Sequence, residues 1–125
     1  MKFITAFKEW LMVKSSGQPG PYYEISGKRE NMITLNTNGK RVLTSEDVKD
    51  VIHKQIKPNF DLSAKNIIIF PHTVENVSMI FIDNIFDLVP KQIRKNYKFY
   101  DFFYIDASEK VTNKILDSVL VGWRL

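Results

Sequence analysis

The sequence predicts a single α+β domain over residues 1–125, with a mixed or antiparallel sheet and helices in the N-terminal, middle and C-terminal parts. Three observations predict it. Apolar residues recur with helical spacing in three stretches, short β-type runs stand between them, and an Asn-Gly pair separates two of the runs. The expected order is α-β-β-β-α-β-β-α-β-α. A chain of this length can bury a core without disulfide bonds or bound metal ions, and it contains no cysteine.

The first helix is predicted over residues 3–14. Its apolar residues are spaced i, i+1, i+4, i+7 and i+8, which places them on one face. Pro19 and Pro21 end it. Three short strands follow at residues 22–25, 32–37 and 40–43. Asn38-Gly39 separates the last two, and because both positions of a tight hairpin turn need positive φ, this pair predicts a β-hairpin.

The middle helix is predicted to start at Thr44, with Asp47 as its capping-box partner, and to end near Pro58. Strands are then expected at residues 66–70 and 77–82. The first contains three consecutive isoleucines, which is typical of a strand buried on both faces. This strand is therefore predicted to lie in the centre of the sheet.

A broken helix is predicted over residues 83–96, with Asp83 as N-cap and a break at Pro90. Residues 97–106 are predicted to form a strand. The last helix is expected to start at Asp106, with Glu109 as capping-box partner. Its expected buried stripe consists of Val111, Ile115, Leu116, Val119, Leu120 and Trp123.

The formal net charge is +4, and the excess lies in residues 1–60, which hold ten Lys or Arg and six Asp or Glu. Such a surface attracts nucleic acid or other anionic partners. No apolar run approaches the roughly 20 residues that span a bilayer, and the N-terminal residues lack the pattern of a signal peptide. A cytoplasmic protein without a membrane partner is the expectation.

The predicted hairpin carries Lys28 and Arg29 before one strand and Lys40 and Arg41 after the Asn-Gly turn. We expect these four cations to form one patch that contacts phosphates. The alternative is that they are ordinary polar turn residues, because lysines protect edge strands from aggregation.

The stretch "RKNYKFYDFFYID", residues 94–106, combines three cations with six aromatic rings. Arg94, Lys95, Tyr97 and Lys98 are the predicted nucleic-acid contacts of this stretch. Residues 95–102 resemble the strand consensus of the RNA-recognition motif, in which Tyr97 would stack on a base. Residues 80–85 resemble the other consensus strand of that family.

The spacing opposes this resemblance. Only fifteen positions separate Ile80 from Lys95, which is too few for the helix and strand that the family places there. The glycines that keep the strand open to bases are also missing. The favoured interpretation is that most of the rings pack in the core, because aromatic residues favour strands.

Few residues point to catalysis. The order of elements over residues 3–70 resembles the core of PD-(D/E)xK nucleases, but the second and third predicted strands carry no carboxylate to bind a metal. His53 is expected on a polar helix surface. His72, near Glu75, is a conceivable base that lacks a nucleophile motif. No enzyme activity, metal or cofactor is expected.

These observations favour a small non-enzymatic nucleic-acid-binding protein that uses the basic β-hairpin. The alternative is a protein-binding adaptor, inhibitor or subunit, of a kind that phages and mobile elements encode, which binds through exposed aromatic residues. The sequence leaves the oligomeric state open.

Overall fold

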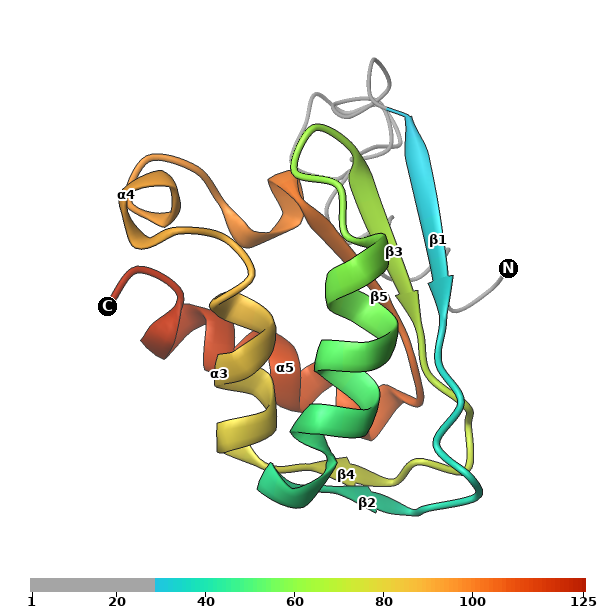
Figure 1. Ribbon diagram of the computed structural model, residues 1–125. Helices are drawn as coiled ribbons and strands as arrows, with labels where there is room; N and C mark the ends of the chain where they lie inside the picture. Colours follow the sequence, from blue (N-terminus) through green and yellow to red (C-terminus); the bar gives the residue numbers. More distant parts are fainter. Residues whose placement is uncertain (1–28) are drawn as a thin grey trace, which may run out of the picture.

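The computed structural model describes residues 29–125, which form one α/β domain (Figure 1). The helix predicted over residues 3–14, the strand predicted over 22–25 and Lys28 lie outside the described residues. Within the described part, parallel strands alternate with helices.

The main sheet has three parallel strands in the order β1-β3-β5. These are β1 (Glu30–Thr34), β3 (Lys65–Ile69) and β5 (Phe103–Asp106). A second, two-stranded parallel sheet joins β2 (Val42–Leu43) to β4 (Asn76–Val77). The prediction of a mixed or antiparallel sheet is therefore wrong. Helices in the connections from β1 to β3 and from β3 to β5 carry the chain back, so that each strand starts at the same end of the sheet.

The predicted β-hairpin is also wrong, although its turn is present. Asn38 and Gly39 have φ values of 54° and 76°, and the Lys40 N–H donates to the Thr37 carbonyl at 3.0 Å. The flanking strands do not pair with each other, because β1 pairs with β3 and β2 pairs with β4. The Asn-Gly pair fixes the local turn, whereas partners distant in the sequence decide the strand pairing.

The middle helix runs through η1 (Ser45–Asp47), η2 (Val48–Ile56) and η3 (Lys57–Asn59). The predicted capping box is confirmed, because a side-chain oxygen of Asp47 accepts the Thr44 N–H at 2.8 Å. Over η2 the helix is a π-helix, in which the Lys57 N–H donates to the carbonyl of Ile52, five residues earlier. Its buried face lies over the sheet (Figure 1).

The strand β3 is central and buried, as the isoleucine run predicts. The strand predicted over residues 77–82 is wrong, since β4 covers only its beginning and α3 (Met79–Phe86) covers the rest. Ser78 caps α3 by accepting the Phe81 N–H, and Asp83 lies inside the helix, so the prediction of Asp83 as N-cap is wrong. A short apolar run fits a strand and a buried helix equally well, and the serine cap decides for the helix.

The predicted break at Pro90 is confirmed, because α4 (Lys91–Arg94) starts directly after it. The strand predicted over residues 97–106 is only partly present. Its first half contains η4 (Phe99–Asp101), which starts where the Asp101 carboxylate accepts the Lys98 N–H at 2.7 Å, and β5 covers the second half.

The last helix, α5 (Glu109–Gly122), starts after Ser108, whose hydroxyl accepts the Val111 N–H. The predicted start at Asp106 is wrong, because that residue ends β5. Val111, Ile115 and Trp123 are buried as predicted, whereas Leu120 is 85% exposed.

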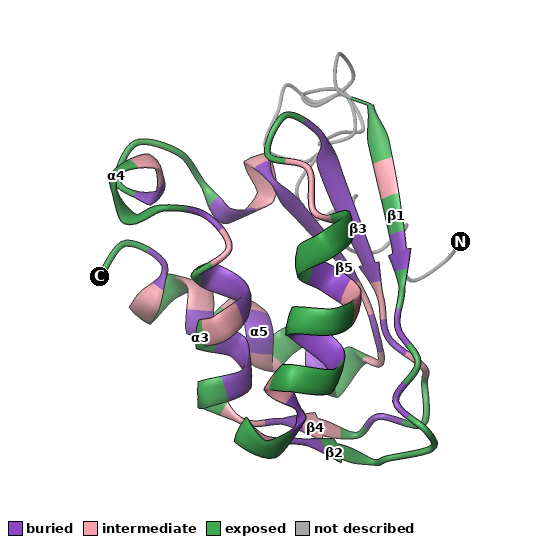
Figure 2. Ribbon diagram, viewed as in Figure 1, coloured by how far each residue is buried: buried purple, intermediate pink, exposed green. Residues whose placement is uncertain are grey.

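The core lies between the main sheet and the helices, and Figure 2 shows that buried residues occur on both. The Trp123 ring meets those of Phe86 and Phe99 edge to face, with centroids 5.4 and 5.3 Å apart. Phe99 also stacks on Phe103 at 4.9 Å. Packing of rings in the core is thus confirmed for four of the six aromatics of residues 94–106, namely Phe99, Phe102, Phe103 and Tyr104.

Candidate nucleic-acid interface

The cations of the predicted hairpin lie at opposite ends of β1. Arg29 precedes the strand, and Lys40 and Arg41 follow the turn beyond its other end (Figure 1). A strand rises about 3.3 Å per residue, so β1 alone separates the two groups by more than about 15 Å. The structure therefore does not bring Arg29 together with Lys40 and Arg41 as one patch.

Each of these three cations has an acidic partner. Arg29 pairs with Asp61, and Arg41 approaches Glu75 at 3.7 Å. Lys40 Nζ lies 2.5 Å from Asp47 Oδ1. All three partners are distant in the sequence or belong to another element. A phosphate group would have to compete with a carboxylate at every one of these positions.

The Lys40–Asp47 pair has the clearest electrostatic signature. Burial of Asp47 alone would raise the pKa of its carboxyl group. Hydrogen bonds from the Lys40 ammonium and the Thr44 N–H outweigh that effect and lower the pKa of Asp47 below its usual value. The same hydrogen bond, together with the charge of Asp47, raises the pKa of Lys40. The pair thus stabilises the start of the middle helix.

Arg94 is buried, with a relative exposure of 5%. Its guanidinium lies 5.8 Å from the centre of the Trp123 ring and donates to the Trp123 carbonyl at 3.5 Å. It also approaches an oxygen of Asp87 at 3.4 Å. Arg94 is one of the predicted nucleic-acid contacts of residues 94–98, but it is buried and therefore not exposed for binding.

The other predicted contacts of this stretch are exposed. Lys95, Tyr97 and Lys98 lie on the connection from α4 to η4, and Lys91 precedes them on α4. The sequence has no Asp or Glu between residues 88 and 100. We call Lys91, Lys95, Tyr97 and Lys98 the α4–η4 surface. It places three exposed lysines and one exposed aromatic ring within residues 91–98 of the chain.

Contacts with the core hold Tyr97 in place. The indole N–H of Trp123 donates to the Tyr97 carbonyl at 2.8 Å, and the Tyr97 ring meets the Phe102 ring at 5.9 Å. The ring nevertheless stays half exposed, since 51% of the residue is accessible. Farther along the chain, Lys98 Nζ lies 5.6 Å from the centre of the Tyr100 ring.

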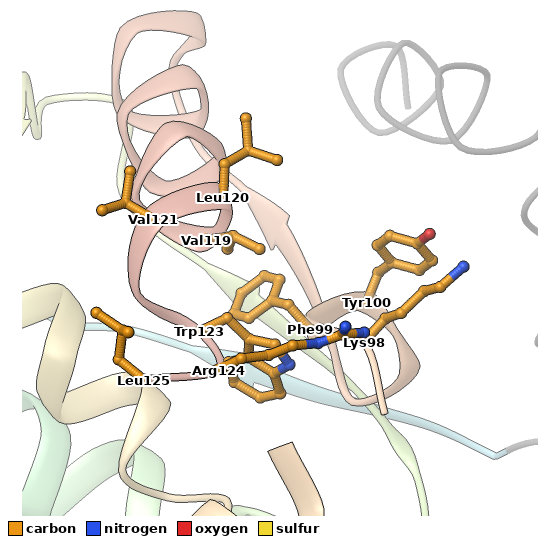
Figure 3. A pocket seen from close by; sticks show the side chains of 9 residues that line it. All are labelled: Lys98, Phe99, Tyr100, Val119, Leu120, Val121, Trp123, Arg124 and Leu125. Carbon is orange, nitrogen blue, oxygen red and sulfur yellow. The ribbon is translucent and has the colours of Figure 1, made fainter. Parts of the chain in front are cut away.

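A groove of about 330 Å³ adjoins this surface, between η4 and the C-terminal end of α5 (Figure 3). Its lining residues are Lys98, Phe99, Tyr100, Val119, Leu120, Val121, Trp123, Arg124 and Leu125. Lys98 and Arg124 bring positive charge to a mainly apolar groove. The sequence does not predict Arg124 or the exposed apolar residues beside it as functional residues. The only signal for them is that Val121 and Leu125 lie outside the predicted buried stripe of the last helix.

His72 is the candidate base, and the structure places it beside Asp106 at the carboxyl ends of β3 and β5. Its Nε2 atom lies 3.9 Å from Asp106 Oδ1, and the His72 side chain is 70% exposed. Burial raises the pKa of Asp106, and the nearby His72 partly opposes the shift. His53 is exposed on η2. The Asp106 side chain is only 16% exposed, so the pair joins an exposed imidazole to a half-buried carboxylate.

Within residues 29–125, no group of three or more His, Cys, Asp or Glu side chains could hold a metal ion. No helix among these residues is both long and apolar enough to cross a membrane. Comparisons with protein-family models, curated proteins and solved structures found no match.

Proposed function

We propose that this protein is a non-enzymatic nucleic-acid-binding protein that binds single strands through the α4–η4 surface. One observation carries the proposal. Lys91, Lys95 and Lys98 are exposed and lie close in the sequence to the half-exposed Tyr97, on a segment that contains no Asp or Glu from residue 88 to residue 100.

Single-strand binding combines positive charges that follow the phosphates with aromatic rings on which bases stack. In this proposal Lys91, Lys95 and Lys98 contact phosphates, and Tyr97 provides the stacking ring. The hydrogen bond from Trp123 to the Tyr97 carbonyl fixes the backbone at that point. Less conformational entropy is then lost when a base stacks, which favours binding.

The α4–η4 surface supports this function better than Arg29, Lys40 and Arg41 do. Those three cations are paired with Asp61, Asp47 and Glu75. No ion pair with another described residue involves Lys91, Lys95 or Lys98. Binding of a phosphate at these lysines would therefore release counterions without displacing a carboxylate of the described residues.

Fluorescence anisotropy with labelled single- and double-stranded DNA and RNA tests the proposal. The double variant K95E/K98E should lose most of the affinity for single strands at low salt. The control K49E/K57E makes the same charge change at exposed positions of η2 and η3 and should retain more of it. Equal losses in both variants would show that only net charge matters and would refute a defined surface.

The alternative function is a protein-binding adaptor, inhibitor or subunit. It is favoured by the exposed apolar residues at the end of α5, because Leu120, Val121 and Leu125 are each more than 70% exposed. If the wild-type protein binds no nucleic acid at low salt, the nucleic-acid proposal is wrong and this alternative takes its place.

A further inference from the structure

The outer face of α5 combines exposed apolar and charged residues. Asn113, Asp117, Leu120, Val121 and Arg124 are spaced i, i+4, i+7, i+8 and i+11, and all five are exposed. This spacing places them along one side of the helix and of the turn that follows it. Figure 3 shows Leu120 and Val121 projecting from α5 away from Trp123. Leu120 is 85% and Val121 72% exposed, so this face has an apolar centre open to water.

The order of residues on this face is self-complementary. When two copies of a helix pack antiparallel about a two-fold axis, residues equally far from the axis lie at the same level. With the axis between Leu120 and Val121, each Leu120 lies level with Val121 of the other copy. Asp117 then lies level with Arg124. Apolar residues meet at the centre, and opposite charges meet on both sides of it.

Beyond this centre, one more apolar side chain is exposed, that of Leu125. The same axis places Leu116 level with Leu125 of the other copy. Leu125 is 75% exposed, and Leu116 is partly buried against the sheet. Leu120, Val121 and Leu125 also line the groove at the end of α5, so a second copy would cover the apolar wall of that groove.

We infer that a second copy of this chain packs on the outer face of α5, with the two α5 helices antiparallel and Asp117 of each copy paired with Arg124 of the other. Neither residue forms an ion pair with another of the described residues, so both are available for this contact. A parallel arrangement would place Asp117 beside Asp117 and Arg124 beside Arg124. Like charges then repel, which selects the antiparallel arrangement.

Sedimentation equilibrium of the 125-residue chain, from micromolar to near-millimolar concentration, tests this inference. The wild-type chain should form a dimer. D117R places two arginines opposite each other at both ends of the contact, and R124D places two aspartates there. Each variant should raise the dimer dissociation constant at least about tenfold, since opposed like charges are costly at an interface.

The double variant D117R/R124D restores opposite charges in reversed order and should recover most of the dimer. The matched controls are D50R and K54D, which make the same charge changes in the exposed Asp50–Lys54 pair of η2 and should leave the dissociation constant unchanged. Circular dichroism confirms that each variant is folded.

Three results would overturn the inference. The first is a wild-type chain that stays monomeric at near-millimolar concentration. The second is a dimer that tolerates D117R and R124D as well as the controls. The third is a folded double variant that remains as weakly associated as the single variants, because a merely charge-sensitive surface elsewhere would not show the reciprocal rescue. The inference does not depend on nucleic-acid binding, because it rests on residues of α5 and of the turn that follows it. Of the α4–η4 surface, only Lys98 lines the groove that the second copy would adjoin.

Discussion

Lys40 Nζ lies 2.5 Å from one carboxylate oxygen of Asp47, and the other oxygen of Asp47 accepts the Thr44 N–H at 2.8 Å. This arrangement connects the turn at Asn38-Gly39 to the start of the middle helix. Asp47 is buried, and both of its carboxylate oxygens accept a hydrogen bond. Lys40 therefore serves as the structural partner of Asp47, and not primarily as a phosphate contact.

D47A should lower the free energy of unfolding by about 1–2 kcal/mol, since it removes a helix cap and the acceptor for Lys40. Urea unfolding measures this effect. The control D50A removes an exposed carboxylate that pairs only within η2, and it should change stability by less than about 0.5 kcal/mol. Equal effects of D47A and D50A would contradict a structural role for the Lys40–Asp47 pair.

The pKa of Asp47 also predicts a pH dependence. Because this pKa is lowered in the folded protein, the unfolded chain binds more protons in the interval between the two values. The stabilisation is therefore fully present above the unfolded pKa of about 3.9 and is lost as the pH falls through the lower folded value.

Urea unfolding of the wild type and D47N from neutral to acidic pH checks this expectation. The difference in stability between them should be constant at neutral pH and shrink below about pH 4. D50N serves as the reference for an exposed carboxylate. A wild-type advantage that grows on acidification would mean that the direction of the shift is wrong.

R94A should lower the free energy of unfolding by about 2 kcal/mol, because the buried side chain packs on Trp123 and its guanidinium contacts the Trp123 carbonyl. K95A, one residue farther on and exposed, should change stability by less than about 0.5 kcal/mol. Thermal unfolding of both variants measures the contrast. If R94A were as stable as K95A, the Arg94–Trp123 contact would contribute nothing to the fold.

Y97A should weaken binding to single strands by about tenfold, because stacking of one base on an aromatic ring contributes about 1–3 kcal/mol. Y97F keeps the ring and should bind nearly as well as the wild type. Anisotropy titrations with single- and double-stranded probes distinguish the loss of base stacking from a general loss of affinity. The loss in Y97A should be larger for single strands. Equal binding by Y97A and the wild type would remove base stacking from the account.

Local signals in the sequence predict much of the fold. Thr44 with Asp47 predicts the start of the middle helix, Pro90 predicts the start of α4, and the isoleucine run predicts the central strand. Each of these features depends on residues close together in the chain. A side-chain cap starts the middle helix, the ring of Pro90 interrupts the preceding helix, and a run of apolar residues suits a strand that is buried on both faces.

Sheet topology was not predictable from such signals. The Asn38-Gly39 turn has the expected conformation, yet contacts about 35 residues apart pair β1 with β3 and so give a parallel sheet. The apolar run at residues 77–82 predicts a strand where most of it forms α3, because a strand and a buried helix share that pattern. The Ser78 cap distinguishes them.

The candidate site was predictable only in part. Lys95, Tyr97 and Lys98 are exposed, as a binding role requires, whereas Arg94 is buried against Trp123, 29 residues later in the chain. Likewise, no local pattern pairs Arg29 with Asp61 across 32 residues. Whether a long charged side chain is buried or forms an ion pair depends on its neighbours in the folded structure, which the sequence around it does not specify.

The salt dependence of single-strand binding tests the central claim most directly. The logarithm of the association constant should fall linearly with the logarithm of the salt concentration, and K98A should reduce the slope by about 0.7, the value for one phosphate contact on a single strand. K49A should leave the slope unchanged. An unchanged slope in K98A, or no binding by the wild type at low salt, would contradict nucleic-acid binding through the α4–η4 surface.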